Sequence, residues 1–344
     1  MGPRVVFLST SEAMWGAEHS LLHIAHGLDK LGVDVEVWAQ SDELIERWEG
    51  RGRLIDLGIR AYTKNRRLLR MIGDLPNDST VVSFDVSLAP TLAVMRPYLQ
   101  RHRIRTALDF HVDQGLGGRR RGIALAARGV DMSLCVSQFM ADQLSPRVRK
   151  TVVWRPMSPV IADPNPPSNF TIGIVGRIDP VKKIELALEA AAAAESRPQI
   201  VLRGGPFAGG DDYVSAVLEL GGRLLGDRFR FDGRVPQTSA LNGLHGLLHC
   251  NDGEPSGRVV AEAQSSGVVP IVPDAGGAPQ FVTHGVTGLV FAANDPQSAA
   301  TCIDTLVDPA VRSRIAADAR RFAQERYDVL TQSAAYGRAL GVLP

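Results

Sequence analysis

The fold is decided by residues 170–194, which read "FTIGIVGRIDPVKKIELALEAAAAA". The first part is a short apolar run that is typical of a buried strand and ends at Gly176. The second part is rich in helix-forming residues, with Asp179 placed as an N-cap and Pro180 as a first-turn proline. A strand that passes through a short turn into a helix is the repeating unit of a parallel α/β sheet.

The same alternation extends to both sides of this stretch. Strands are expected upstream at residues 5–10, 34–40, 53–58, 81–85, 106–110, 132–137 and 151–155, and downstream at 199–205, 229–233, 246–250 and 268–273. Prolines crowd residues 156–167, where neither a helix nor a central strand can continue. The sequence therefore predicts two Rossmann-like parallel-sheet domains that face each other across a cleft. Their expected limits are 1–160 for the N-terminal domain, 161–168 for the hinge, 169–322 for the C-terminal domain, and 323–344 for a helical tail that crosses back.

Composition places the chain among ordinary globular proteins. It has 344 residues, 44% of them hydrophobic, and a net charge of +1, so no polyelectrolyte partner is indicated. Cys135, Cys250 and Cys302 are widely spaced and lie in apolar surroundings, which predicts buried thiols in a reducing compartment. No signal peptide or membrane span is expected, and the predicted location is cytoplasmic.

Charged residues collect where strands end and helices begin, which is where doubly wound sheets bind ligands. Arg177 and Lys182 follow the strand that ends at Gly176, and two cations beside a helix start suit a diphosphate. Lys183 is the weaker candidate. Gly16 stands at the first strand–helix junction, where a glycine allows close backbone approach to a ligand.

A second stretch, "NDGEPSGRVVAEAQSSGVVPIVPDAGGAPQ" at residues 251–280, places two acids around a glycine. Glu254 is expected in a loop and Glu262 about one turn into the following helix, with Gly257 between them. Each carboxylate can accept hydrogen bonds from sugar hydroxyls, so the pair suits the two ends of a nucleotide sugar.

These motifs resemble those of retaining glycosyltransferase family 4, which has the GT-B fold. "EPSGRVVAEA" followed by "DAGG" is similar to the family pattern Glu-Pro-Phe-Gly-x-x-x-x-Glu-Ala with a later Gly-Gly turn. "VGRIDPVKKIE" resembles its Val-Gly-Arg element, "WGAEHS" its N-terminal Gly-Gly-x-Glu element, and "DFHVDQG" its histidine-containing strand end. The matches follow the family order along nearly the whole chain.

The resemblance implies a role for each residue. Glu254, with the amides near Ser256 and Gly257, would hold the donor sugar, and Glu262 would bind the ribose. Arg177 and Lys182 would neutralise the departing diphosphate. The implied set is completed by Gly16 near the phosphates and His111 near the anomeric carbon.

Several positions depart from the family pattern. Trp15 replaces the first glycine of the N-terminal pair, Ser256 replaces an aromatic residue, and Lys183 stands where glycine is usual. Cys250 and Asn251 replace Pro-Ser, and Gln280 stands where glutamate is common. These changes leave the cations and the paired glutamates in place, but they bear on donor preference.

The predicted function is transfer of a hexosyl unit from a nucleoside-diphosphate sugar to a hydroxyl acceptor, with retention at the anomeric carbon. UDP is favoured only because it is common in the family. There is no Asp-x-Asp motif, so no metal and no cofactor are expected beyond the nucleotide sugar as co-substrate.

Three alternatives remain at this stage. Another GT-B enzyme, such as a nucleotide-sugar epimerase or a phosphorylase, has the same fold. A non-catalytic nucleotide-sugar-binding subunit is the second, although such a binder does not need leaving-group cations. A dinucleotide-dependent oxidoreductase is disfavoured, because Gly-x-Gly-x-x-Gly spacing is missing after the first strand.

The acceptor is not identified by the sequence. The resemblance implies that residues 1–160 bind the acceptor and residues 169–322 the donor, and the expected acceptor is a small-molecule, glycan or lipid-linked hydroxyl. Basic clusters at residues 64–70, 101–105 and 119–121 suit a lipid-linked acceptor or a phosphorylated or acidic small one. Contact with the inner membrane face is left open, although solvated surface arginines are the favoured interpretation. Nucleic acid is not expected, because no aromatic residues interleave with the basic runs.

Overall fold

The structure is a computed structural model, and it describes residues 4–12, 14, 16–55, 66–111, 127–156, 169–206 and 210–344. The chain divides into two compact units. The first comprises Met1–Ser158 and Tyr327–Pro344, and the second comprises Pro159–Arg326. The predicted hinge at residues 161–168 lies outside the described residues, and the predicted domain limits remain a prediction.

The first unit is built on a parallel sheet. Among its described residues seven strands lie in the order β3-β2-β1-β4-β5-β6-β7. The strands are β1 (Arg4–Ser9), β2 (Asp34–Ala39), β3 (Arg51–Leu54), β4 (Thr80–Ser83), β5 (Arg105–Phe110), β6 (Met132–Cys135) and β7 (Lys150–Val152). Strands β1, β4 and β5 are almost entirely buried, so their carboxyl ends are held by a rigid core.

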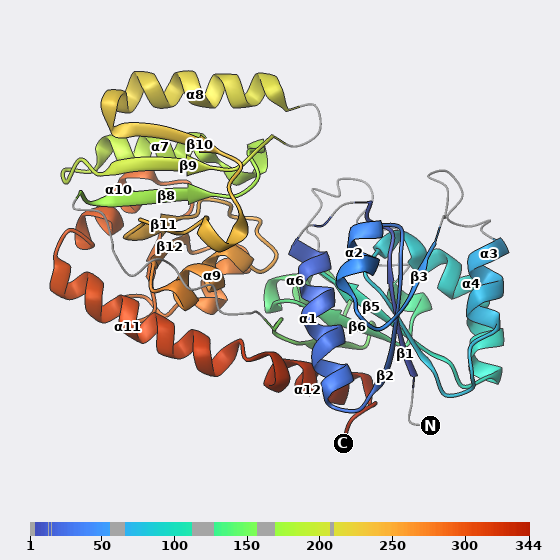
Figure 1. Cartoon of the computed structure of the whole chain (residues 1–344). Coiled ribbons are helices and arrows are strands. Elements are labelled where there is room, and N and C mark those ends of the chain that lie inside the picture. The colour runs from blue at the N-terminus through green and yellow to red at the C-terminus, as the bar shows by residue number, and fades with distance from the viewer. Residues whose placement is uncertain are drawn as a thin grey trace. The chain divides into compact units, whose positions relative to one another are not determined.

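Helices flank this sheet (Figure 1). They are α1 (Gly16–Lys30), α2 (Asp42–Arg47), α3 (Arg66–Gly73), α4 (Ala89–Arg101), α6 (Gln138–Gln143) and α12 (Val329–Leu340). Helix α12 comes from the C-terminal end of the chain and packs against α1, so the predicted return of the tail to the first domain is confirmed.

The second unit repeats the architecture with a smaller sheet. Six parallel strands appear in its described part, in the order β10-β9-β8-β11-β12-β13. They are β8 (Thr171–Val175), β9 (Gln199–Arg203), β10 (Phe229–Gly233), β11 (Gly246–Leu248), β12 (Val269–Pro273) and β13 (Leu289–Phe291). The prediction of two Rossmann-like parallel sheets is confirmed, although β13 was not expected.

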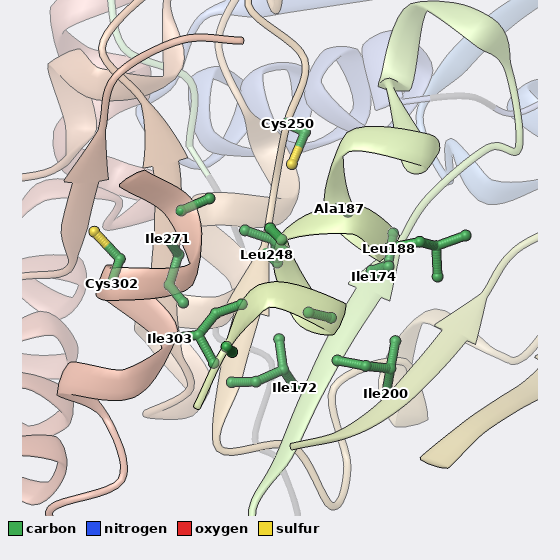
Figure 2. Packing of buried hydrophobic residues seen from close by; sticks show 14 of the residues in the cluster. Ile172, Ile174, Ala187, Leu188, Ile200, Leu248, Cys250, Ile271, Cys302 and Ile303 are labelled. Atoms are coloured by element: carbon green, nitrogen blue, oxygen red, sulfur yellow. The ribbon is translucent and has the colours of Figure 1, made fainter. Parts of the chain in front are cut away.

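The helices of the second unit are α7 (Ile184–Ala193), α8 (Asp211–Leu225), α9 (Arg258–Ser266), α10 (Pro296–Thr305) and α11 (Pro309–Arg326). In Figure 2, Ile172, Leu248 and Ile271 from neighbouring strands gather with Leu188 of α7 and Ile303 of α10. This core fixes the adjacent strands β8 and β11, whose carboxyl ends lead into the two motif loops.

The helix after β8 does not begin where the sequence predicts. Asp179 caps a short 3-10 turn at Pro180–Lys182 by accepting the Val181 N–H, and α7 starts only at Ile184. Lys183 lies between them with φ of +51°, in the left-handed region where glycine is favoured. The expected continuous helix is therefore wrong, and the break occurs where the family pattern has glycine.

Lys183 has a structural role that offsets its backbone conformation. Its ammonium lies 2.5 Å from Oδ2 of Asp252 and 2.5 Å from Oδ1 of Asn294. Asn294 also donates to Asp252 at 3.1 Å. Lys183 thus links the turn after β8 to the loop that precedes Glu254.

Two further expectations concern the cysteines and membrane spans. Cys135, Cys250 and Cys302 are free and buried, as predicted, and burial raises the pKa of each thiol. Across the described ranges, no helix has both the length and the apolar character needed to cross a bilayer.

The packing of α12 on α1 predicts a sharp steric effect. A Cβ on Gly27 would lie 2.5 Å from Cβ of Ser333 and 3.1 Å from the Val329 carbonyl oxygen. We expect Gly27→Ala to lower the free energy of unfolding by roughly 1–3 kcal/mol, because α12 must move to admit the methyl group. Urea denaturation of the purified chain measures this change.

Gly222 provides the control. It lies in α8, exposed, and a Cβ there would meet nothing within 4 Å. Gly222→Ala is expected to raise the free energy of unfolding by about 0.4–1 kcal/mol, since alanine is the better helix former. Equal effects of the two substitutions would contradict the packing of α12 on α1.

Candidate functional site

The centre of the candidate site is an ion pair between two residues that the sequence singles out. Lys182 places Nζ 2.6 Å from Oε2 of Glu254. The same carboxylate accepts from Nδ2 of Asn251 at 3.1 Å and from the Gly257 N–H at 3.4 Å. Burial raises the pKa of Glu254, but the Lys182 ammonium and these hydrogen bonds outweigh it and hold the pKa at about 2. Glu254 is therefore a carboxylate at neutral pH.

A glycine turn holds the loop that carries Glu254. The Gly277 N–H donates to the Glu254 carbonyl oxygen at 2.6 Å. Gly276 has φ of +79°, and a Cβ there would lie 2.9 Å from the Asp252 carbonyl oxygen and 3.1 Å from the Glu254 nitrogen. Only glycine allows the two backbones to approach so closely. The "DAGG" turn thus fixes the position of the glutamate loop.

Helix α9 carries the second glutamate, as predicted. Gly257 is its N-cap, with φ of +75°, and Glu262 lies about one turn into the helix. Oε1 of Glu262 accepts from Nε of Arg258 at 2.9 Å and from Nε2 of Gln237 at 2.6 Å. Gln237 was not singled out from the sequence, because it lies in a 3-10 turn far from both motifs.

Arg177 lies two residues after the end of β8 and five residues before Lys182. Its guanidinium lies 2.7 Å from Oδ2 of Asp179, and 43% of its side chain is exposed. An exposed pair of this kind contributes little stability and exchanges partners readily. Arg177 is therefore available to an anion that arrives from solvent. Ser256 is half-buried in the loop between Glu254 and Gly257.

A buried histidine touches the same carboxylate and was missed by sequence reasoning. His249 follows β11, and only 6% of it is exposed. Its Nε2 lies 3.7 Å from Oε2 of Glu254, which is too long for a hydrogen bond, and it has no hydrogen-bond partner among the described residues. Burial lowers the pKa of His249, and the nearby Lys182 lowers it further. Glu254 raises it but is outweighed, and the pKa is about 4. The run "GLLHC" resembles a plain apolar strand, which hid this residue.

His111 belongs to a separate network in the first unit. Its Nδ1 lies 3.1 Å from Oδ1 of the buried Asp109. Asp109 also accepts from Nη2 of Arg155 at 2.8 Å and from the hydroxyl of Tyr336 at 2.7 Å. Burial raises the pKa of Asp109, but Arg155, His111 and Tyr336 together hold it below its usual value. The network fixes the imidazole ring through Nδ1.

Gly16 is the first residue of α1 and is exposed. Two residues further on, Glu18 is buried and accepts from the hydroxyl of Ser9 at 3.2 Å. Trp15 lies outside the described residues. Gly16 and His111 belong to the first unit, so their meeting with the Lys182–Glu254 pair remains a prediction.

Metal-ligating side chains do not cluster in the described part of the chain: no group of three or more His, Cys, Asp or Glu residues is placed to hold a metal ion. The predicted independence from metal ions remains a prediction.

Solved structures define the fold. HepE of Anabaena in its complex with UDP-glucose superposes with a TM-score of 0.85 at 20% identity, over 99% of this chain and 100% of that one. A glycosyltransferase from Rickettsia africae superposes with a TM-score of 0.80 at 15% identity, over 98% and 99% of the two chains. The fold is the GT-B fold, as the motifs predicted.

Residues 162–322 match the family model described as glycosyl transferases group 1. This match lies within the second unit, and it supports the predicted resemblance to a glycosyltransferase of the GT-B fold. A D-inositol 3-phosphate glycosyltransferase of Frankia alni is 34% identical over 157 residues, which is 42% of this chain and 39% of that protein. Its counterpart in Mycolicibacterium vanbaalenii is 32% identical over 191 residues, 49% of this chain and 41% of that protein. The matches thus span about two fifths of the length of these curated relatives.

The acid dependence of stability follows from the two pKa shifts around Glu254. The folded chain keeps His249 neutral down to about pH 4, whereas the unfolded chain protonates it near pH 6.5. Glu254 adds a second proton difference between about pH 4.5 and 2. Above pH 6.5 both groups have the same charge in the folded and the unfolded chain. As the pH falls below 6.5 for His249 and below 4.5 for Glu254, the unfolded chain binds the proton first, and the folded chain loses stability. We expect the free energy of unfolding to fall by about 1.4 kcal/mol per pH unit for each group.

Urea unfolding from pH 7.5 down to pH 3 measures this dependence. His249→Gln is expected to remove the loss between about pH 6.5 and 4.5 and to keep the loss at lower pH. If the difference in the free energy of unfolding between wild type and His249→Gln does not change with pH, the prediction that His249 is neutral in the folded chain is contradicted.

The Asp109 network predicts that Tyr336→Phe destabilises the chain. The substitution leaves a buried carboxylate with one hydrogen bond fewer, so the free energy of unfolding should fall by roughly 1.5–3 kcal/mol. Tyr98 is the matched control, because its hydroxyl donates to the Gly73 carbonyl oxygen at 2.6 Å on the surface. Tyr98→Phe should cost less than about 1 kcal/mol in the same urea denaturation. Equal losses would contradict a special role for Tyr336.

Proposed function

We propose that this protein transfers a hexosyl unit from a nucleoside-diphosphate sugar, with UDP favoured, to a hydroxyl acceptor, with retention at the anomeric carbon. The observation that carries the proposal is the Lys182–Glu254 pair at the carboxyl ends of β8 and β11. Ligands of open parallel sheets bind at these ends. The family match over residues 162–322 supports the same chemistry.

The donor site assigns each residue a part of the nucleotide sugar. Glu254 accepts hydrogen bonds from the sugar hydroxyls, and the backbone amides near Ser256 and Gly257 donate hydrogen bonds to the sugar oxygens. Glu262 binds the ribose hydroxyls through Oε2, because Gln237 and Arg258 both donate to Oε1. Gly16 would bring the backbone of the first unit to the phosphates.

Arg177 and Lys182 stabilise the charge that develops on the diphosphate as its bond to the anomeric carbon breaks. Cations placed before the reaction lower the barrier, because they need not reorganise when the charge appears. Their presence gives the protein a way to assist the leaving group without a metal ion. This is the basis on which we propose metal independence.

Retention is proposed to proceed by attack on the face that the diphosphate leaves. The bond from the anomeric carbon to the phosphate oxygen breaks, and the acceptor oxygen bonds to the same face of that carbon. The acceptor proton passes to the departing phosphate oxygen. His111, oriented through Asp109, is placed near the donor sugar in this scheme.

The base of the donor and the acceptor class are proposed from the solved neighbours and the curated relatives. UDP is supported by the solved neighbours, since HepE of Anabaena was solved with UDP and with UDP-glucose. Curated relatives act on D-inositol 3-phosphate by name, which makes a phosphorylated polyol the first acceptor class to test. A cytoplasmic location fits both substrates.

Thermal stabilisation by nucleotides tests the proposed function. UDP, GDP, ADP, TDP and NAD are added separately to wild type and to Glu262→Ala. A ligand present at 100 times its Kd stabilises the folded chain by about 2.7 kcal/mol, which is a shift of several degrees in Tm. We expect one nucleoside diphosphate to raise Tm in wild type and to do so much less in Glu262→Ala.

Glu189→Ala is the control, since Glu189 is an exposed acid on helix α7. It should retain the full shift. No shift with any diphosphate, or a shift with NAD alone, would contradict a glycosyltransferase. The nucleotide that binds then defines the donor for an acceptor screen that begins with inositol phosphates and glycans.

A further inference from the structure

His249 is a buried polar group that the proposed transfer does not yet use. It lies beside the Lys182–Glu254 pair, and its Nε2 has no hydrogen-bond partner within the described part of the chain. An unpartnered buried polar atom lowers stability, so a protein retains one at a site only with a compensating gain. The atom lies 3.7 Å from Oε2 of Glu254, which points to the gain.

Lys182 is the cation that compensates the charge of the Glu254 carboxylate, and it is also a candidate ligand of the diphosphate. Its ammonium lies 2.6 Å from Oε2 of Glu254. If Lys182 turns toward a diphosphate, Glu254 loses the cation that compensates its charge. Only 14% of the Glu254 side chain is exposed, and a buried carboxylate without its partner is strongly destabilising. Asn251 and Gly257 still donate to it at 3.1 and 3.4 Å, but both are neutral donors and neither replaces the positive charge of Lys182.

We propose that His249 takes the place of Lys182 on Glu254 when Lys182 binds the diphosphate of the donor. His249 is the Nε2–H tautomer in this exchange, and it approaches Oε2 by less than about 1 Å to reach hydrogen-bond distance. It is a positioning residue, because it acts on the sugar and the diphosphate only through Glu254 and Lys182. This inference rests on the proposed function for the ligand that attracts Lys182.

The charges around His249 favour the exchange in both states. Lys182 and Glu254 are the two charged groups that act on the imidazole. While Lys182 stays on Glu254, its charge opposes protonation of His249. After Lys182 turns away, only the carboxylate faces the imidazole, and its attraction strengthens a hydrogen bond from Nε2–H.

A double-mutant cycle tests the exchange in the ligand-free protein. Calorimetry at pH 7.5 compares wild type, His249→Leu, Lys182→Met and the double variant. His249→Leu is expected to leave Tm of the wild type unchanged or higher, because it removes an unpartnered polar group. In the Lys182→Met background the same change should lower Tm by about 2–4 °C, because His249 there is already the partner of Glu254. Equal effects in the two backgrounds would overturn the exchange, and any packing cost of leucine cancels in the comparison.

Titration calorimetry with UDP tests the ligand-bound state. We expect His249→Leu to weaken UDP binding at least about tenfold, the size of a charge-assisted hydrogen bond. His249→Gln keeps an N–H donor near the position of Nε2 and should restore most of the affinity. His245→Leu is the matched control, since His245 is a buried histidine just before β11, and its Nδ1 accepts the Thr171 N–H at 3.1 Å. Its Kd for UDP should equal that of wild type.

The outcomes separate this inference from the proposed function. If wild type binds no nucleoside diphosphate, the proposed function is overturned, and the ligand-bound half of the exchange with it. If wild type binds UDP and His249→Leu binds it equally well, only the exchange is overturned. Weaker binding in His249→Leu with recovery in His249→Gln supports both.

Discussion

The ion pair between Lys182 and Glu254 is the interaction on which the candidate site depends. It joins the ends of two adjacent parallel strands, β8 and β11, and places a carboxylate where only 14% of it is exposed. A buried pair gains little net stability, because desolvation of two charges offsets their attraction. Its retention at this place is better explained by what the two charges do when a ligand separates them.

Backbone packing makes this arrangement possible. The Glu254 loop is held on one side by the Gly276–Gly277 turn, which approaches too closely for any side chain, and on the other by the Lys183–Asp252 pair. Neither support is part of the proposed chemistry. Together they keep Glu254 in one position while its hydrogen-bond partner changes, which an unsupported loop would not allow.

The sequence predicted the two sheets and the motif loops because both depend on local patterns. Apolar runs of strand length, a proline after an N-cap residue and glycines in turns are visible within a few residues of each other. The sequence did not predict the break at Lys183, because nothing local shows that Asp252 and Asn294 would compensate a left-handed lysine. It also missed β13 (Leu289–Phe291).

The same reasoning explains which site residues were missed. Glu254, Lys182, Glu262 and Arg177 belong to motifs. His249, Gln237 and Tyr336 belong to none, and their importance shows only in their contacts in the folded chain. Tyr336 reaches Asp109 across 227 positions, and no spacing rule predicts such a bond. His249 is close in sequence to Glu254, but its importance depends on its Nε2 atom, which has no hydrogen-bond partner among the described residues. A pattern of residue types records which groups are present, whereas an unmet hydrogen bond exists only in three dimensions. His249 and Gln237 are of this second kind, because they act on the motif residues without belonging to a motif.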